Sequence, residues 1–85
     1  SFFSIYTNSV IIETIKLAED GDGIIVRLYE SYGLEISAML SWVCNYHYVQ
    51  YVDLQENKLD DSFYCNQYCN LEFKPFEIIT LRLTQ

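Results

Sequence analysis

Four side chains that can bind transition metals lie in two pairs along the chain. Cys44 and His47 are separated by two residues, and Cys65 and Cys69 follow with three residues between them. Structural zinc is usually held by four such thiolate and imidazole groups. The second spacing departs from the tight pairs of known zinc modules. Two interpretations are open, a zinc site or ordinary thiols beside a surface histidine. We favour the second and predict no metal site.

An acidic segment, Glu19–Gly23, has the sequence Glu-Asp-Gly-Asp-Gly and invites a calcium interpretation. Calcium loops of the helix–loop–helix kind spread their ligands over a longer segment and end on a bidentate glutamate, which is missing here. An Asp-Gly pair between two apolar runs is instead typical of a tight β-hairpin. The segment therefore predicts a hairpin turn.

Catalytic groups are not recognisable in the chain. Paired carboxylates can hydrolyse glycosides, but no two of the twelve acidic residues are marked as a facing pair. His47 is the only histidine, and no serine or cysteine stands in a nucleophile motif. We predict no catalytic and no cofactor-binding residue, and no enzyme activity of this chain alone.

Tyrosine is abundant. Exposed tyrosine rings can stack on sugars, as in carbohydrate-binding modules, and they pack equally well in cores and protein interfaces. We favour core or interface packing and keep an autonomous carbohydrate-binding module as the alternative. The residues concerned are Tyr6, Tyr29, Tyr32, Tyr46, Tyr48, Tyr51, Tyr64 and Tyr68.

Composition limits the partners of the chain. Its 85 residues predict one domain, and the first of them, Ser1, suggests a fragment of a longer protein. The net charge is −7, which argues against nucleic acid and anionic membranes as partners. Three cysteines without a paired framework, and no Asn-x-Ser/Thr sequon, favour a reducing compartment, so we expect a cytoplasmic location. The five cations are scattered as Lys16, Arg27, Lys58, Lys74 and Arg82.

The elements that must position these residues are predicted to be strands. Val, Ile, Tyr, Phe and Thr are frequent, and apolar and polar residues alternate between short turn signals. Together they predict an all-β fold, a small antiparallel sandwich of six or seven strands. On the last strand Ile79, Leu81 and Leu83 share a face that should fill the core, and the opposite Ile78 face could pack on another domain. The strands are expected at residues 10–17, 24–30, 35–43, 46–54, 63–65, 71–73 and 76–84, with Pro75 at an edge, a bulge or a switch between sheets.

Three stretches of the sequence resemble a known family. Val10–Gly23, Ile24–Gly33 and Phe73–Leu83 are similar to the extreme C-terminal β-sandwich of glycoside hydrolase family 38 α-mannosidases, best to the cytosolic and bacterial branch. The middle, Trp42–Cys69, departs from the family pattern, although within it Tyr51–Glu56 keeps a Val-Asp-Leu-x-Glu sequence.

The resemblance implies a role without chemistry. Members of the family are retaining, zinc-dependent exo-α-mannosidases, whose zinc ligands and aspartate nucleophile lie in an N-terminal α/β domain outside this sequence. No catalytic residue carries over to this chain. The resemblance implies that residues 1–85 are a C-terminal accessory domain that packs against other domains of the same polypeptide, while the parent enzyme binds mannosylated glycans.

Overall fold

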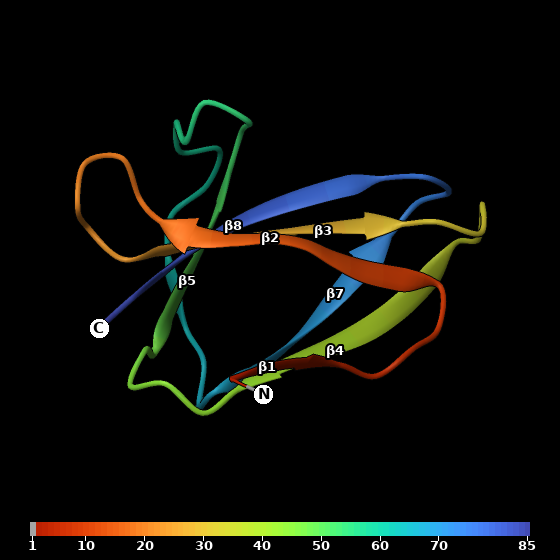
Figure 1. Ribbon diagram of the computed structural model, residues 1–85, viewed down its shortest axis with the longest axis horizontal. Coiled ribbons are helices and arrows are strands. Elements are labelled where there is room, and N and C mark those ends of the chain that lie inside the picture. Colours follow the sequence, from red (N-terminus) through yellow and green to blue (C-terminus); the bar gives the residue numbers. More distant parts are fainter. Residues whose placement is uncertain (1) are drawn as a thin grey trace.

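A computed structural model describes residues 2–85, which form eight strands and contain no helix (Figure 1). No described segment is therefore a helix that could cross a membrane. The predicted all-β sandwich is confirmed, with eight strands rather than six or seven. The additional strand is β1. The strands are β1 (Phe3–Ile5), β2 (Val10–Leu17), β3 (Ile24–Glu30), β4 (Ile36–Trp42), β5 (Tyr48–Val52), β6 (Phe63–Tyr64), β7 (Tyr68–Phe73) and β8 (Ile78–Thr84).

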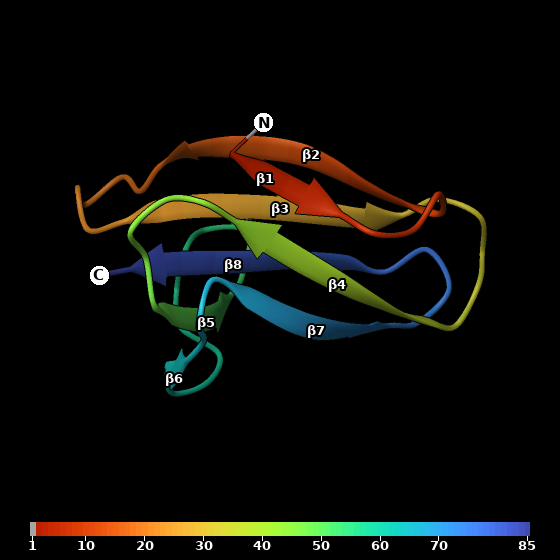
Figure 2. The same ribbon diagram turned by 90° about the horizontal axis from the view of Figure 1, so that it is seen from below.

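The strands form two antiparallel sheets that lie one over the other. The smaller sheet has the order β1-β4-β7, and the larger has the order β2-β3-β8-β5-β6. Figure 2 shows β4 and β7 running obliquely over the larger sheet. The chain crosses between the sheets several times; it passes from the large sheet to the small one between β3 and β4, and from the small sheet to the large one between β7 and β8. Pro75 lies in the β7–β8 connection, so its interpretation as a switch between sheets is confirmed.

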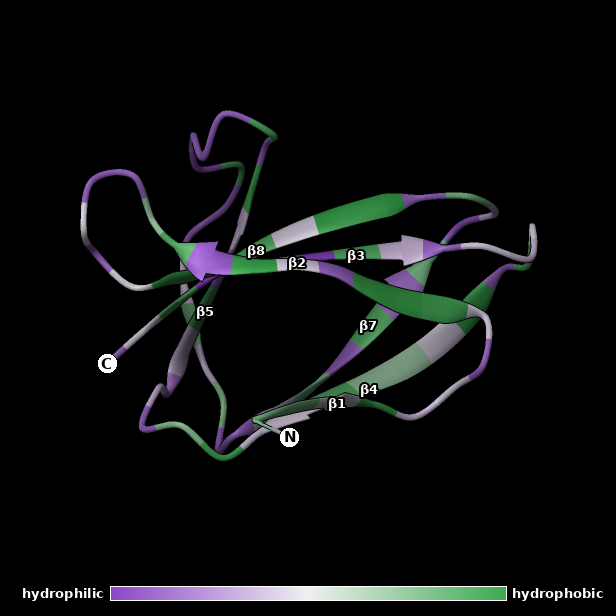
Figure 3. Cartoon of the chain, in the orientation of Figure 1, coloured by the Kyte–Doolittle hydropathy of each residue, from purple (hydrophilic) through white to green (hydrophobic). Residues whose placement is uncertain are grey.

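The core lies between the two sheets and is built from alternate residues of their strands. Ile79, Leu81 and Leu83 of β8 are buried there, as their alternation predicts. Figure 3 shows that apolar residues recur along the strands of both layers. Burying one such side chain contributes about 1.5–3 kcal/mol. The other sheet supplies Ala38, Leu40, Trp42, Cys69, Leu71 and Phe73.

The β2–β3 hairpin has the bounds that its sequence predicts. Its apolar, β-branched strands favour extended backbone, and the turn between them is closed by the Ala18 amide, which donates to the Gly23 carbonyl at 3.0 Å. Gly21 and Gly23 have φ of 78° and 95°, a region that glycine adopts without steric cost. The acidic segment is thus a hairpin turn.

Glu13 forms a β-bulge in β2. Ile12 pairs with Leu28 and Thr14 with Arg27, so Glu13 is the extra residue opposite β3. A bulge interrupts the alternation of side chains along a strand. Simple alternation would put Ile15 on the face opposite Ile12. The bulge turns Ile15 back to the inner face instead, where it pairs with Val26.

Glu30, at the end of β3, is a fully buried carboxylate. Its two oxygens accept the backbone N–H groups of Tyr32, Gly33, Leu34 and Phe76 at 2.7–3.1 Å. Burial alone would raise the pKa of this carboxyl, but the four amides outweigh it and lower the pKa below the ordinary value of 4.5. Glu30 therefore joins the β3–β4 connection to the β7–β8 connection at one end of the molecule.

Several strand ends differ from the predictions. The expected strand at 76–84 begins at Ile78, because residues 74–77 form a turn closed by the Glu77 amide on the Lys74 carbonyl. The expected strand at 71–73 begins earlier, at Tyr68, where Cys69 continues the buried alternation. The strands expected at 35–43, 46–54 and 63–65 are each shorter than predicted.

Candidate binding pocket between the sheets

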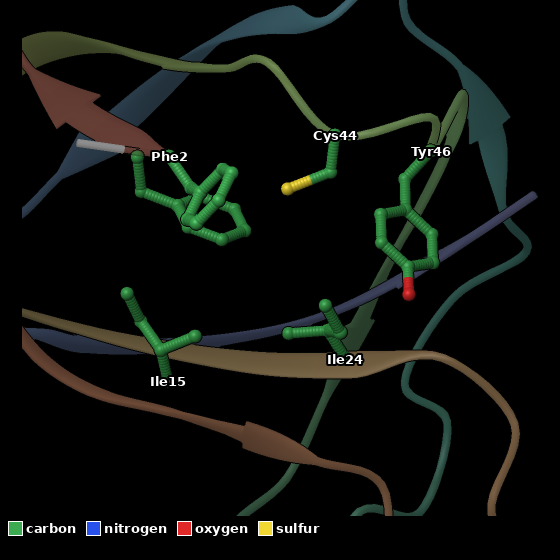
Figure 4. A pocket seen from close by; sticks show the side chains of 6 residues that line it. Phe2, Ile15, Ile24, Cys44 and Tyr46 are labelled. Carbon is green, nitrogen blue, oxygen red and sulfur yellow. The ribbon is translucent and has the colours of Figure 1, made fainter.

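An open apolar pocket lies where the two sheets separate beside the edge strand β2. Its volume is about 580 Å³, and Figure 4 shows the side chains that line it. Phe2 and Cys44 approach from the side of the smaller sheet, and Ile15 and Ile24 face them from the larger one. The full lining is Phe2, Phe3, Ile15, Ile24, Cys44 and Tyr46.

The bulge in β2 positions the floor of this pocket. Because Glu13 resets the alternation, Ile15 points inward although the smaller sheet does not cover it. It is half-exposed, and the next inward residue, Leu17, is 76% exposed. Strand alternation alone did not predict that Ile15 lines a pocket. The available signal was Glu13 between Ile12 and Thr14, a polar residue that breaks an apolar strand.

The wall of the pocket is held by side-chain hydrogen bonds to the loop between β4 and β5. The Trp42 indole Nε1 donates to the Tyr46 carbonyl at 2.8 Å. The Gln67 amide Nε2 donates to the Cys44 carbonyl, also at 2.8 Å. Trp42 is buried in the core, and Gln67 is partly exposed. The loop that carries Cys44 and Tyr46 is thus tied to both β4 and the β6–β7 connection.

The lining of the pocket favours an apolar occupant. The only polar groups on the six lining side chains are the Cys44 thiol and the Tyr46 hydroxyl, and the rest is hydrocarbon. Sugars present many hydroxyl groups that need hydrogen-bond partners when they are buried. This pocket offers few, so it suits an aliphatic or aromatic side chain better than a sugar.

The four residues weighed as zinc ligands do not converge. Cys44 lines the pocket (Figure 4), and the His47 ring stacks on Tyr64 with ring centres 5.9 Å apart. Cys65 and Cys69 are buried in the core, where their thiols hydrogen-bond each other. Across residues 2–85, no three His, Cys, Asp or Glu side chains gather closely enough to hold a metal ion.

The acidic turn is tied to Arg82. The guanidinium Nη1 of Arg82 lies 2.8 and 2.9 Å from the two oxygens of Asp20 and donates to the Asp22 carbonyl at 2.9 Å. The hydrogen bond from Arg82 lowers the pKa of Asp20. This carboxylate is thus engaged with a cation of the protein itself, which fits a structural turn better than a calcium loop.

Where the pKa of a carboxyl group in the described chain is shifted, it is lowered. Asp53 is held by the Asn57 amide, and Glu56 by the Glu19 amide at 2.9 Å, with Lys16 3.2 Å from its other oxygen. Asp20 and Glu30 shift in the same direction. A general acid for glycoside hydrolysis needs a raised pKa. These four carboxylates therefore stabilise turns and are unsuited to that role.

The tyrosines divide between the core and the surface. Tyr46 and Tyr51 pack against the core, as the interpretation of half-buried strand tyrosines predicts. An aromatic group gathers around β5 and β6, where Tyr64 stacks on His47, the residue before β5, and meets the edge of Tyr48 at 5.8 Å. The tyrosines that are largely exposed are Tyr6, Tyr32, Tyr48, Tyr64 and Tyr68.

Comparison with known proteins agrees with this architecture. Residues 9–81 match the family described as glycosyl hydrolases family 38 C-terminal beta sandwich domain. This span runs from just before β2 into β8 and so includes most of both sheets. No curated protein matches the chain. Because the match covers most of the sequence, the chain belongs to the family of glycosyl hydrolase family 38 C-terminal β-sandwich domains.

Proposed function

We propose that the chain is a non-catalytic accessory domain of a zinc-dependent, retaining α-mannosidase and acts by packing against other domains of that enzyme. Membership in the family makes it an accessory part of a glycoside hydrolase family 38 enzyme. The observation that carries the packing role is the open apolar pocket, which leaves hydrocarbon in water at Phe2 and Ile15, while Leu17 of the same strand is exposed outside it. Exposed apolar surface of this kind is typical of protein contacts.

The chemistry is assigned to another part of the enzyme. The described residues hold no cluster of metal ligands, and the pKa values of Asp20 and Glu30 are lowered, opposite to what proton donation needs. Zinc therefore does not fit this chain, and no step of hydrolysis is assigned to it. Terminal α-mannosides on glycans would reach the enzyme at its catalytic domain. We further propose a cytoplasmic location, which is supported by three cysteines in the thiol form.

The proposal is tested with an activated aryl α-mannoside and with unfolding measurements. The isolated chain should show no hydrolysis above the blank. In the full-length enzyme, Ile15→Glu should lower the melting temperature, because it buries a charge where an apolar side chain docks. The same substitution in the isolated chain should have a small effect, since Ile15 is half-exposed there.

A matched control is Asn70→Glu, which adds the same charge at an exposed position of β7 on the smaller sheet. It should leave both melting temperatures nearly unchanged. Hydrolysis by the isolated chain would refute the accessory role. If Ile15→Glu changed the melting temperatures of the full-length enzyme and of the isolated chain equally, packing at the pocket would be refuted.

Carbohydrate binding is the second candidate, and the aromatic group of His47, Tyr48 and Tyr64 is the observation that favours it. Titration with mannose and manno-oligosaccharides, followed by amide chemical shifts, separates the two functions. Changes in the amide chemical shifts that are localised around Tyr64 would support sugar binding. Unchanged chemical shifts would support packing alone. Trp42 fluorescence is a poor reporter because this side chain is 3% exposed.

A further inference from the structure

The outer face of the five-stranded sheet is covered at one end and bare at the other. The loop of residues 53–62 rises over the end nearest to the β2–β3 turn (Figure 1). At that end Ala18, Ile25 and Val52 form a small buried cluster of their own. Within residues 2–85, no segment covers the opposite end, where β2 and β8 begin and β3 ends (Figure 1).

Three apolar side chains lie abreast at the bare end. Tyr29 of β3 pairs with Ile11 of β2 on one side and with Ile78 of β8 on the other. Residues directly opposite each other in antiparallel strands share a face of the sheet. Ile11 and Ile78 are 50% and 47% exposed. The Ile78 face that the sequence marks as apolar is thus part of a patch that crosses three strands.

Arg27 lies beside this patch, on the same face of β3, between Thr14 and Thr80 of the adjacent strands. Its Nε atom is buried and has no hydrogen-bond partner in the described chain. The ion pairs found among residues 2–85 join other cations, Lys16 and Arg82, to carboxylates. A buried donor without an acceptor costs free energy.

The charge balance makes this arrangement informative. The chain has 12 acidic and 5 basic residues, so carboxylates are in excess. Even so, none of them forms an ion pair with Arg27 among the described residues. An acceptor from outside the chain would satisfy the buried Nε, and a carboxylate suits a guanidinium best because it accepts two N–H groups at once.

We propose that this bare end, called here the Arg27 face (Ile11, Thr14, Arg27, Tyr29 and Ile78), is the surface on which a neighbouring domain of the same family 38 polypeptide packs. That domain places apolar side chains on the isoleucines and a carboxylate on Arg27. The inference rests on the proposed function and adds the surface and the chemistry of the partner. A second copy of the chain is a poorer occupant, because two copies with a net charge of −7 repel each other.

The test compares hydroxyl-radical oxidation of two tyrosines in the full-length enzyme and in the isolated chain. Tyr29 reports on the Arg27 face, and Tyr68, which is exposed on β7, reports on the opposite sheet. Packing on the Arg27 face should slow oxidation of Tyr29 about fivefold in the full-length enzyme, since interface cores exclude water. Tyr68 should be oxidised at the same rate in both samples.

Each other outcome overturns the inference in a distinct way. Protection of Tyr68 in place of Tyr29 would mean that the opposite sheet is the docking surface, so interdomain packing would stand and the Arg27 face would fail. Equal oxidation of both tyrosines, and of Phe2 at the pocket, in the two samples would refute interdomain packing itself. Protection of Tyr29 in the isolated chain that grows with protein concentration would show that a second copy is the occupant.

Substitution of Arg27 tests whether a carboxylate of the neighbouring domain pairs with it. In the full-length enzyme Arg27→Gln should restore most of the Tyr29 oxidation seen in the isolated chain, whereas Lys58→Gln, which removes an exposed cation on the 53–62 loop, should not. Far-ultraviolet circular dichroism of the isolated variants shows whether both still fold. Full protection of Tyr29 in folded Arg27→Gln would refute the predicted ion pair.

Discussion

The Glu30 carboxylate accepts the backbone N–H of Phe76 at 3.0 Å, although the two residues are 46 positions apart in the sequence. The same oxygen accepts the Gly33 amide at 2.7 Å. Gly33 follows β3 and Phe76 precedes β8, so one side chain joins two of the segments that carry the chain between the sheets. The Phe76 ring also lies over Gly33, where an added Cβ atom would come within 2.8 Å of the ring.

Glu30→Ala should destabilise the domain strongly, because it leaves four backbone amides without their acceptor in a buried site. Glu30→Gln should cost less. Its amide oxygen can still accept from Gly33, Leu34 and Phe76, while its NH₂ group meets the Tyr32 amide donor. Urea unfolding of the three proteins at neutral pH checks this order. Equal stability of Glu30→Ala and the parent would refute the role of the carboxylate.

Acid should unfold the domain. The pKa values of Asp20, Glu30, Asp53 and Glu56 are lowered in the folded chain, so the unfolded state binds protons first as the pH falls. Their contributions to stability are complete above the ordinary values of 3.8 and 4.5, and are lost as the pH drops through the lower folded values. Urea midpoints between pH 7 and pH 2 should decline below about pH 5, and Glu30→Gln should show a shallower decline.

The two glycines of the β2–β3 turn offer a matched pair. Both have positive φ, so alanine at either position costs about 1–2 kcal/mol in backbone strain. Gly21 has open space around it, whereas a Cβ atom on Gly23 would lie against the backbone carbonyl of Leu83. Gly23→Ala should therefore lower the free energy of unfolding by clearly more than Gly21→Ala. If the two variants lost similar amounts of unfolding free energy, β8 would have to move away from residue 23 without an energetic cost.

The three thiols should differ in reactivity. Burial raises the pKa of Cys69 to about 12, and it also raises the pKa of Cys65. Cys44 is half-exposed at the pocket. Iodoacetamide at pH 8 should therefore alkylate Cys44 in the native chain and reach the other two only after unfolding, since the thiolate is the reactive form. Mass spectrometry of digested samples measures each site, with the urea-unfolded chain as control.

The sequence predicts the β2–β3 hairpin to the residue, because a β-branched run, an Asp-Gly turn and a second apolar run each give a strong local signal. It misses β1, since the three residues Phe3–Ile5 are too few to show an alternation and are held by distant residues, through pairing with β4 and burial of Phe3 in the core. It also extends the last strand too far, because the turn at residues 74–77 depends on Glu30, which is distant in sequence.

The pocket and the Arg27 face depend on geometry that local patterns do not contain. The pocket exists because the smaller sheet does not extend over Ile15. The sequence of one strand does not show how far the opposite sheet extends. The apolar patch requires the register of three strands to bring Ile11, Tyr29 and Ile78 abreast. The alternation in β8 does identify Ile78 as a residue on the face away from the core, and this part of the patch was predicted.

The bulge at Glu13 has a consequence for how the domain behaves before it meets a partner. β2 is an edge strand of eight mostly apolar residues, and such an edge can recruit strands from other molecules and start aggregation. With one residue out of step and a charge at that point, the free edge no longer offers a regular ladder of donors and acceptors. The residue that turns Ile15 into the pocket thereby also protects the exposed edge against uncontrolled sheet growth.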